Sequence, residues 1–288
     1  MRTDTSVRYR EAMLPGPLQS SGYRTVLLVG ATGSGKTSLV RQLIGVDPAT
    51  EPFPAISVAK TTVSETEILL APGGHYAVAT FRSEDEVRTA VEECLEAAAE
   101  ALLAGRPRSA AVRALYEHGD QKFRLRYLLG PVDVAGAAER DPGWTDEILA
   151  QLEDLGGGSV EAVGDVVMGW IAERAGRLPW GTLQRDDRGW PTAWHAVFDS
   201  RVQLTDALTR VSGNDAGQFG QLLTPLVGGL RVRGPFHPRW SAEIPYLMLI
   251  DTEGLGHSFH ASPALPTELV EALDRVDHVV VVDNATQP

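Results

Sequence analysis

The stretch from Gly30 to Thr37, GATGSGKT, decides the fold. It fits the pattern G-x-x-x-x-G-K-[ST] without deviation, and loops of this kind surround nucleotide phosphates. Their glycines let successive backbone N–H groups turn toward the phosphates, where Cβ atoms would collide. Lys36 offers a compact cation to the β- and γ-phosphates, and the Thr37 hydroxyl is placed to bind Mg²⁺. We therefore expect the loop to bind a nucleoside triphosphate together with Mg²⁺.

The sequence on both sides of this loop supports the interpretation. Residues 25–29, TVLLV, are typical of a buried parallel strand, and residues 38–45, SLVRQLIG, place apolar side chains at helical spacing. A glycine-rich turn between a strand and a helix, without a ligand, is the alternative that we consider weaker. The residues that we expect to contact the nucleotide are Gly30, Thr32, Gly33, Ser34, Gly35, Lys36, Thr37 and Ser38.

A second motif, Asp251-Thr-Glu-Gly254, directly follows the apolar run YLMLI at residues 246–250. The pattern D-x-x-G is weak by itself, because it also starts at Asp133, Asp154 and Asp186. Only Asp251 stands at the end of a continuous apolar strand, where a carboxylate beside the phosphate loop is needed for Mg²⁺. Gly254 then offers a backbone N–H to the γ-phosphate. An acidic turn at a strand end is the alternative.

The predicted fold is α/β. Residues 25–29, 246–250 and 278–282 are expected to be strands of one sheet, and the alternating runs 63–69 and 76–81, joined by a Gly-Gly turn, predict a hairpin. Ser83 and Glu86 form a predicted capping box at the start of a long helix. From there to about residue 240 the periodicity is mostly helical, and no strong strand is expected.

We therefore predict a P-loop NTPase domain of Rossmann-like type, with a largely parallel sheet and a hairpin. It comprises residues 23–83 and 241–288 and is interrupted by a mostly helical insertion at 84–240. Residues 1–22 show no sustained periodicity and are expected to be an N-terminal tail.

Composition narrows the function classes. The 288 residues contain 26 Lys+Arg and 38 Asp+Glu, a formal net charge of −12, which argues against extensive binding of nucleic acid or of anionic membranes. Cys94 is the only cysteine, so an internal disulfide and a multi-cysteine metal site are excluded. The sequence has neither an apolar run long enough to span a membrane nor a signal-peptide core at its start, and we expect a cytoplasmic protein.

The phosphate loop together with LIDTEGLG, residues 249–256, resembles the GTPases of the dynamin and guanylate-binding protein (atlastin-like) group. The resemblance covers about residues 23–83 and 241–288. It implies a threonine after the first helix that binds Mg²⁺ and senses the γ-phosphate, and both Thr61 and Thr62 occupy that place. On this basis Lys36, Thr61, Thr62 and Gly254 are the candidate catalytic residues. The candidate metal ligands are Thr37, Thr61, Thr62 and Asp251.

Two departures from that pattern matter. Leu255 follows Gly254 where small Ras-like GTPases carry a glutamine that orients water, so we expect slow hydrolysis. The guanine-reading patterns N-K-x-D and T-K-x-D are absent, since Lys60 and Lys122 stand in AKTT and QKFR. The sequence stops at Pro288, shortly after the last predicted strand. We therefore expect poor discrimination between GTP and ATP, and expect a C-terminally longer native chain to prefer GTP.

The predicted function is Mg²⁺-dependent binding and slow hydrolysis of a nucleoside triphosphate, as in a GTPase-like switch. The alternatives are an ATP-dependent P-loop ATPase and a scaffold that senses nucleotide without hydrolysing it. The expected partner is the nucleoside triphosphate, and a homodimer across the nucleotide face is a candidate assembly. The alternation in QKFRLRYLL indicates a solvated face rather than a nucleic-acid groove. Residues 231–240 are basic and aromatic, and we weigh an arginine finger or a partner surface against a solvated connector.

Overall fold

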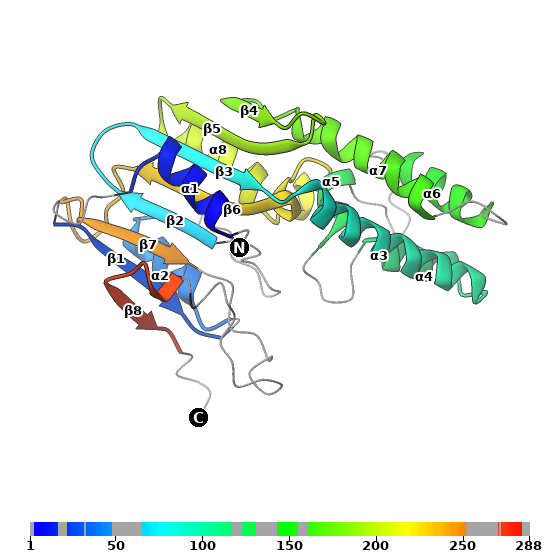
Figure 1. The fold of residues 1–288 in the computed structure, drawn as a ribbon. Helices are drawn as coiled ribbons and strands as arrows, with labels where there is room; N and C mark the ends of the chain where they lie inside the picture. Colours follow the sequence, from blue (N-terminus) through cyan, green and yellow to red (C-terminus); the bar gives the residue numbers. More distant parts are fainter. Residues whose placement is uncertain are drawn as a thin grey trace.

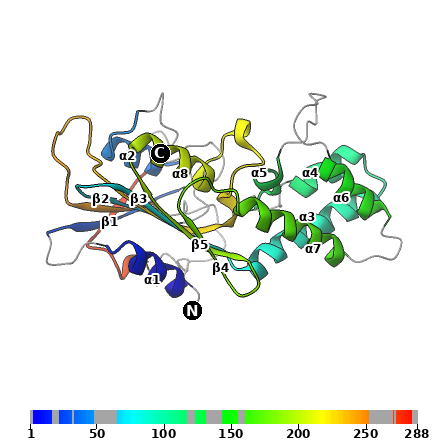
Figure 2. The same ribbon diagram turned by 90° about the horizontal axis from the view of Figure 1, so that it is seen from above.

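A computed structural model describes residues 3–16, 22–31, 33–47, 65–116, 123–130, 143–154, 160–251, 270 and 272–283. These residues form one eight-stranded sheet with helices on both faces and a group of helices at one end (Figures 1 and 2). The strands are β1 (Arg24–Val29), β2 (Glu65–Leu70), β3 (His75–Phe81), β4 (Thr182–Arg185), β5 (Pro191–Phe198), β6 (Val227–Gly234), β7 (Leu247–Asp251) and β8 (His278–Val281).

The helices follow the same chain order. They are α1 (Thr3–Met13), α2 (Lys36–Leu43), α3 (Glu84–Leu103), α4 (Arg108–Tyr116), α5 (Leu125–Leu129), α6 (Gly143–Glu153), α7 (Val160–Ala175) and α8 (Arg201–Ser212). Two short 3₁₀ helices, η2 (Ala216–Gln218) and η3 (Thr224–Leu226), lead into β6. Within the described residues, no helix is both long and apolar enough to cross a membrane.

The sheet is mixed, with the strand order β4-β5-β3-β6-β2-β7-β1-β8. Parallel pairs join β1 to β7, β1 to β8 and β2 to β6. The pairs β2–β7, β3–β5, β3–β6 and β4–β5 are antiparallel. The prediction of an α/β fold is therefore confirmed, whereas the prediction of a largely parallel sheet is wrong.

The predicted hairpin is also wrong, because β6 lies between β2 and β3. Strand β6 pairs in parallel with β2, with Arg231 opposite Glu67, and antiparallel with β3, with Arg231 opposite Val78. The two runs are strands and a short turn does connect them, but a strand far along the chain separates them in the sheet. Alternation in a sequence identifies a strand without identifying its neighbour.

The prediction that residues 84–240 contain no strong strand is wrong, because β4, β5 and β6 lie in this range. The helical pattern does hold for 84–175, which contains α3 to α7 (Figure 1). The predicted capping box at the start of α3 is confirmed. The Ser83 hydroxyl accepts from the Glu86 backbone N–H at 3.3 Å, and the Glu86 carboxylate accepts from the Ser83 N–H at 2.9 Å. Strands from both predicted parts share one sheet, so the sheet marks no boundary between them. The division of the chain into a nucleotide domain and an insertion stays a prediction.

Apolar residues cover both faces of the sheet. Leu28 and Leu249 belong to the large core, which continues into the helices at the end of the sheet. Leu27 and Ile250, their neighbours along the strands, face the other way and pack against Ala272. Figure 2 shows α2 and α8 on the first face and α1, with the segment around residues 272–277, on the second.

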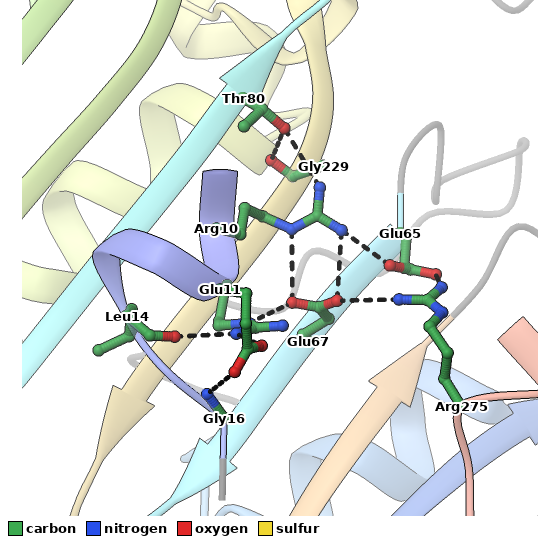
Figure 3. A network of polar contacts seen from close by, with 10 residues as sticks. Arg10, Glu11, Leu14, Gly16, Glu65, Glu67, Thr80, Gly229 and Arg275 are labelled. Carbon is green, nitrogen blue, oxygen red and sulfur yellow. Dashed lines mark hydrogen bonds and ion pairs between the residues drawn. The ribbon is translucent and has the colours of Figure 1, made fainter. Parts of the chain in front are cut away.

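The N-terminal residues do not form only a tail, because residues 3–13 are α1, which lies against β3 and β6. A polar network attaches it to the sheet (Figure 3). The Arg10 side chain is 2% exposed and donates to Glu65 at 2.8 Å, to Glu67 at 3.2 Å and to the Thr80 hydroxyl at 3.2 Å. Helical periodicity of apolar residues could not reveal this helix, because a buried guanidinium anchors it.

Three arginines and three glutamates share this network. Arg231 donates to Glu67, to Glu11 and, at 2.8 Å, to the Leu14 carbonyl. Arg275 donates to the second oxygen of Glu65 at 2.9 Å. The other members are Arg10, described above, and Glu11, Glu65 and Glu67, so that the six formal charges cancel. Arg231 is thus buried in the sheet, and the sequence-based alternatives of an arginine finger, a partner surface or a solvated connector are wrong for this residue.

The two glutamates of β2 respond to the network in opposite ways. Burial alone would raise the pKa of Glu67, but Arg10 and Arg231 outweigh it and lower that pKa to about 2. Burial, followed by the neighbouring Glu67 charge, raises the pKa of Glu65. Glu67 therefore adds stability above its unfolded pKa near 4.5, and this stability is lost as the pH falls toward 2.

We predict that Glu67→Gln lowers the free energy of unfolding by about 3 kcal/mol at neutral pH, because it removes the one carboxylate that pairs with both buried guanidinium groups, Arg10 and Arg231. The difference from wild type should shrink as the pH falls below about 4.5. Urea unfolding followed by circular dichroism between pH 3 and 7 measures both effects.

Glu65→Gln is the matched control, because a raised pKa reverses the sign. Its stability relative to wild type should fall on acidification, while that of Glu67→Gln recovers. The same pH dependence in both variants would contradict the assignment of Glu67 as the ionised centre of the network.

Candidate phosphate-binding site

The loop between β1 and α2 depends on glycine for its conformation. Gly33 and Gly35 have φ angles of 82° and 99°, in the left-handed region that side chains with a Cβ rarely adopt. The Ser34 N–H donates to the Ala31 carbonyl at 3.1 Å and closes a tight turn between these residues. A Cβ placed at Gly33 or Gly35 would meet no atom within 4 Å, so their requirement for glycine is conformational.

Gly30 is required for a different reason. It stands at the end of β1, and a Cβ there would lie 2.1 Å from the Val282 carbonyl oxygen and 2.8 Å from the Ser34 hydroxyl. The Val282 N–H donates to the Val29 carbonyl at 2.7 Å, which draws this backbone close to the loop. The first glycine of the motif therefore permits β1 and the end of β8 to approach each other.

Lys36 opens α2 and points back into the loop. Its ammonium donates to the carbonyl oxygens of Gly30 at 2.9 Å and Ala31 at 3.1 Å, and the side chain is buried. Burial lowers the pKa of Lys36, and the nearby carboxylate of Asp251 opposes that shift. The loop thus holds a cation over its own backbone, at the N-terminal end of a helix.

Thr37 and Asp251 connect the two sequence motifs. The Thr37 hydroxyl donates to one carboxylate oxygen of Asp251 at 2.9 Å. Asp251 is the last residue of β7, where it lies opposite Leu28 of β1 and Thr66 of β2. The pKa of Asp251 is raised by burial, and the Thr37 hydroxyl and the Lys36 charge oppose this shift only in part.

Two oxygen atoms at this site are buried without a hydrogen-bond partner among the described residues: the second carboxylate oxygen of Asp251 and the hydroxyl of Ser34. Gly35 is the N-cap of α2, and no side chain caps this helix end. Mg²⁺ prefers oxygen ligands and is usually held by one or two protein groups together with substrate phosphates. Helix N-termini favour anions. The residues present therefore fit a phosphate group and a magnesium ion.

The structure brings several of the sequence-predicted residues together, and others lie outside the residues that it describes. Gly30, Gly33, Ser34, Gly35, Lys36 and Thr37 form the loop and the start of α2, and Asp251 adjoins them through Thr37. Ser38 follows on α2 and is exposed. Thr32, Thr61, Thr62 and Gly254 lie outside the described residues, and their roles stay predictions.

Comparison with known proteins adds little. No family model matches the chain, and no curated protein matches it. One solved structure, described as "An oligomerised bacterial dynamin pair provides a mechanism for the long range sensing and tethering of membranes", is similar with a TM-score of 0.38 and 14% identity. The match covers 99% of this chain and 26% of that one, so this chain spans about a quarter of its length. The functional argument consequently depends on the residues of the site, and a homodimer stays a prediction.

We predict that Gly30→Ala destabilises the protein more than Gly33→Ala. The second variant only places alanine in a left-handed conformation, at about 1 kcal/mol. The first variant requires the backbone at Val282 to move as well. Urea unfolding of both variants measures the difference, and equal losses would show that the approach of Val282 does not constrain the loop.

Proposed function

We propose that this protein binds a nucleoside triphosphate with Mg²⁺ at residues 30–37 and hydrolyses it slowly, as a GTPase-like switch. The observation that supports this most directly is the hydrogen bond from Thr37 to Asp251, between residues 214 positions apart in the sequence. The phosphate-loop pattern and the D-x-x-G pattern are separate stretches of the sequence, and a single site with both is what triphosphate chemistry requires.

Each described residue has a role in this proposal. Lys36 neutralises phosphate charge when its ammonium exchanges the carbonyls of Gly30 and Ala31 for phosphate oxygens. Backbone N–H groups from Gly33 to Thr37 stabilise negative charge at the N-terminus of α2. Thr37 and Asp251 would hold the metal ion, which when bound would neutralise phosphate charge.

The resemblance assigns the remaining roles in the proposal. Thr61 or Thr62 would complete the metal site, and Gly254 would sense the γ-phosphate through its N–H. Leu255 cannot polarise the attacking water, so hydrolysis is expected to be slow. A preference for GTP over ATP would depend on this resemblance alone, because none of the described residues is assigned to the base.

The first test replaces Lys36 by alanine. We expect calorimetry with Mg²⁺ and either GTP or ATP to show a loss of affinity of at least about a hundred-fold, because the phosphates lose a direct buried counter-ion. Lys122→Ala is the matched control, since it removes another of the chain's three lysines at a position outside the motif. Equal affinity of wild type and Lys36→Ala would overturn the assignment of the loop.

The second test is competition of GTP against ATP on the wild-type chain. The described groups contact only phosphates in the proposed mode, and phosphate contacts do not distinguish the bases. We therefore expect the two affinities to agree within about ten-fold, which corresponds to about 1.4 kcal/mol. A stronger preference for GTP would show that residues within this chain read the guanine base.

A further inference from the structure

The network that anchors α1 involves residues of β2, β3 and β6, and α1 lies on the face of the sheet opposite to α2 (Figure 2). We propose that α1 is a regulatory element of this site, and that its docking on the sheet depends on whether the site is empty or holds Mg²⁺ and a nucleoside triphosphate. The coupling passes through Glu65, Glu67 and Arg275. This proposal rests on the function proposed above, and its test separates the two.

Polar contacts, rather than apolar packing, hold α1 in place. Of its residues 6–13 only Arg10 is buried, and none of the described apolar clusters contains a residue of this helix. Arg10 instead binds Glu65 and Glu67 (Figure 3), and Glu11 binds Arg231. An element with few apolar contacts belongs to the least stable part of a structure and can detach while the rest stays folded.

The first connection to the phosphate site runs through paired strands. Asp251 lies opposite Thr66, and Glu65 and Glu67 are the two chain neighbours of Thr66. Because side chains alternate across a strand, Thr66 faces the same side as Asp251, whereas both glutamates face α1. A displacement of Asp251 therefore bears on the backbone that positions both carboxylates.

The second connection runs through Arg275. This residue follows Ala272, which packs on Leu27 and Ile250 directly behind the ends of β1 and β7. Arg275 donates to one oxygen of Glu65, and Arg10 donates to the other. One carboxylate thus joins α1 to a segment that rests on the phosphate-site strands.

The network favours two discrete arrangements over a gradual change. Its six formal charges cancel, and three of the side chains, Arg10, Glu67 and Arg231, are buried, so that loss of a partner weakens the pairing of a buried charge. In the docked arrangement the Thr37 hydroxyl is bound to Asp251. Triphosphate with Mg²⁺ competes for these same two oxygen-bearing groups, and we therefore expect it to favour the undocked helix.

Gly229 supplies a way to undock α1 without changing any charge. It lies in β6 between Glu65 and Thr80, and a Cβ there would fall 2.0 Å from a guanidinium nitrogen of Arg10. Its neighbour Gly228 is exposed, and a Cβ there would meet only the Thr80 carbonyl oxygen at 3.6 Å and more distant atoms. Gly229→Ala should therefore displace Arg10, and Gly228→Ala is its matched control.

The test measures hydrogen exchange of the amides in residues 3–14 of the full chain. Wild type without nucleotide is compared with wild type that is saturated with the Mg complex of a non-hydrolysable GTP analogue. We expect exchange in α1 to be about five-fold or more faster with the triphosphate analogue. Since coupling is reciprocal, Gly229→Ala should raise the affinity for the analogue by a similar factor, and Gly228→Ala should leave this affinity unchanged.

Arg275→Gln is the second variant, and it guards against a general loss of stability in Gly229→Ala. It removes the link between Glu65 and the phosphate-site strands but leaves every bond of Arg10 in place. We expect the analogue to accelerate exchange in α1 less in this variant than in wild type, because only the connection through the paired strands remains. Equal or slower exchange with the analogue in wild type would overturn the coupling. Failure of wild type to bind the analogue would overturn the proposed function itself.

Discussion

The position of β7 between β1 and β2 is the constraint on which the candidate site depends. Its last residue, Asp251, lies opposite Leu28 in one neighbour and Thr66 in the other. Two ladders of backbone hydrogen bonds therefore position the residue that carries this carboxylate, independently of its side-chain contacts. The same register carries β1 into the glycine loop at the level of Asp251, so that Thr37, at the start of α2, reaches it.

The two faces of these strands bury charge for different purposes. Glu67 is bound by Arg10 and Arg231, which lower its pKa to about 2 against the effect of burial, so it has no capacity for a further ligand. Asp251 has a hydroxyl and a nearby ammonium, its pKa is raised by burial, and one of its oxygens has no partner among the described residues. A saturated buried carboxylate holds a fold together, whereas an unsaturated one is suited to bind something else.

The sequence predicted the local chemistry of the site much better than the arrangement of the sheet. The phosphate loop and the strand before Asp251 could be recognised because glycine positions and apolar runs are local patterns. The place of β6 could not, because its inward-facing Arg231 makes the strand look polar and its partner Glu67 is 164 positions away. Glu65 and Glu67 lie on one face of a strand that continues as Ile68-Leu69-Leu70, and this was the available indication that buried cations face the strand. Helix α1 could not be predicted either, because a buried arginine, Arg10, anchors it in place of an apolar face.

The direction of the strands gives the helical group a defined relation to the phosphate site. Following the pairings from β1 through β7, β2 and β6 shows that β3 runs in the same direction as β1. Helix α3 therefore leaves the sheet at the end where the phosphate loop begins, four strand spacings or about 19 Å to the side. Leu28 and Val40, beside the loop, share one apolar core with the helices beyond α3. Because a close-packed core transmits displacement, a change in the register of β1 or β7 would reach both the helical group and α1, from opposite faces of the same strands.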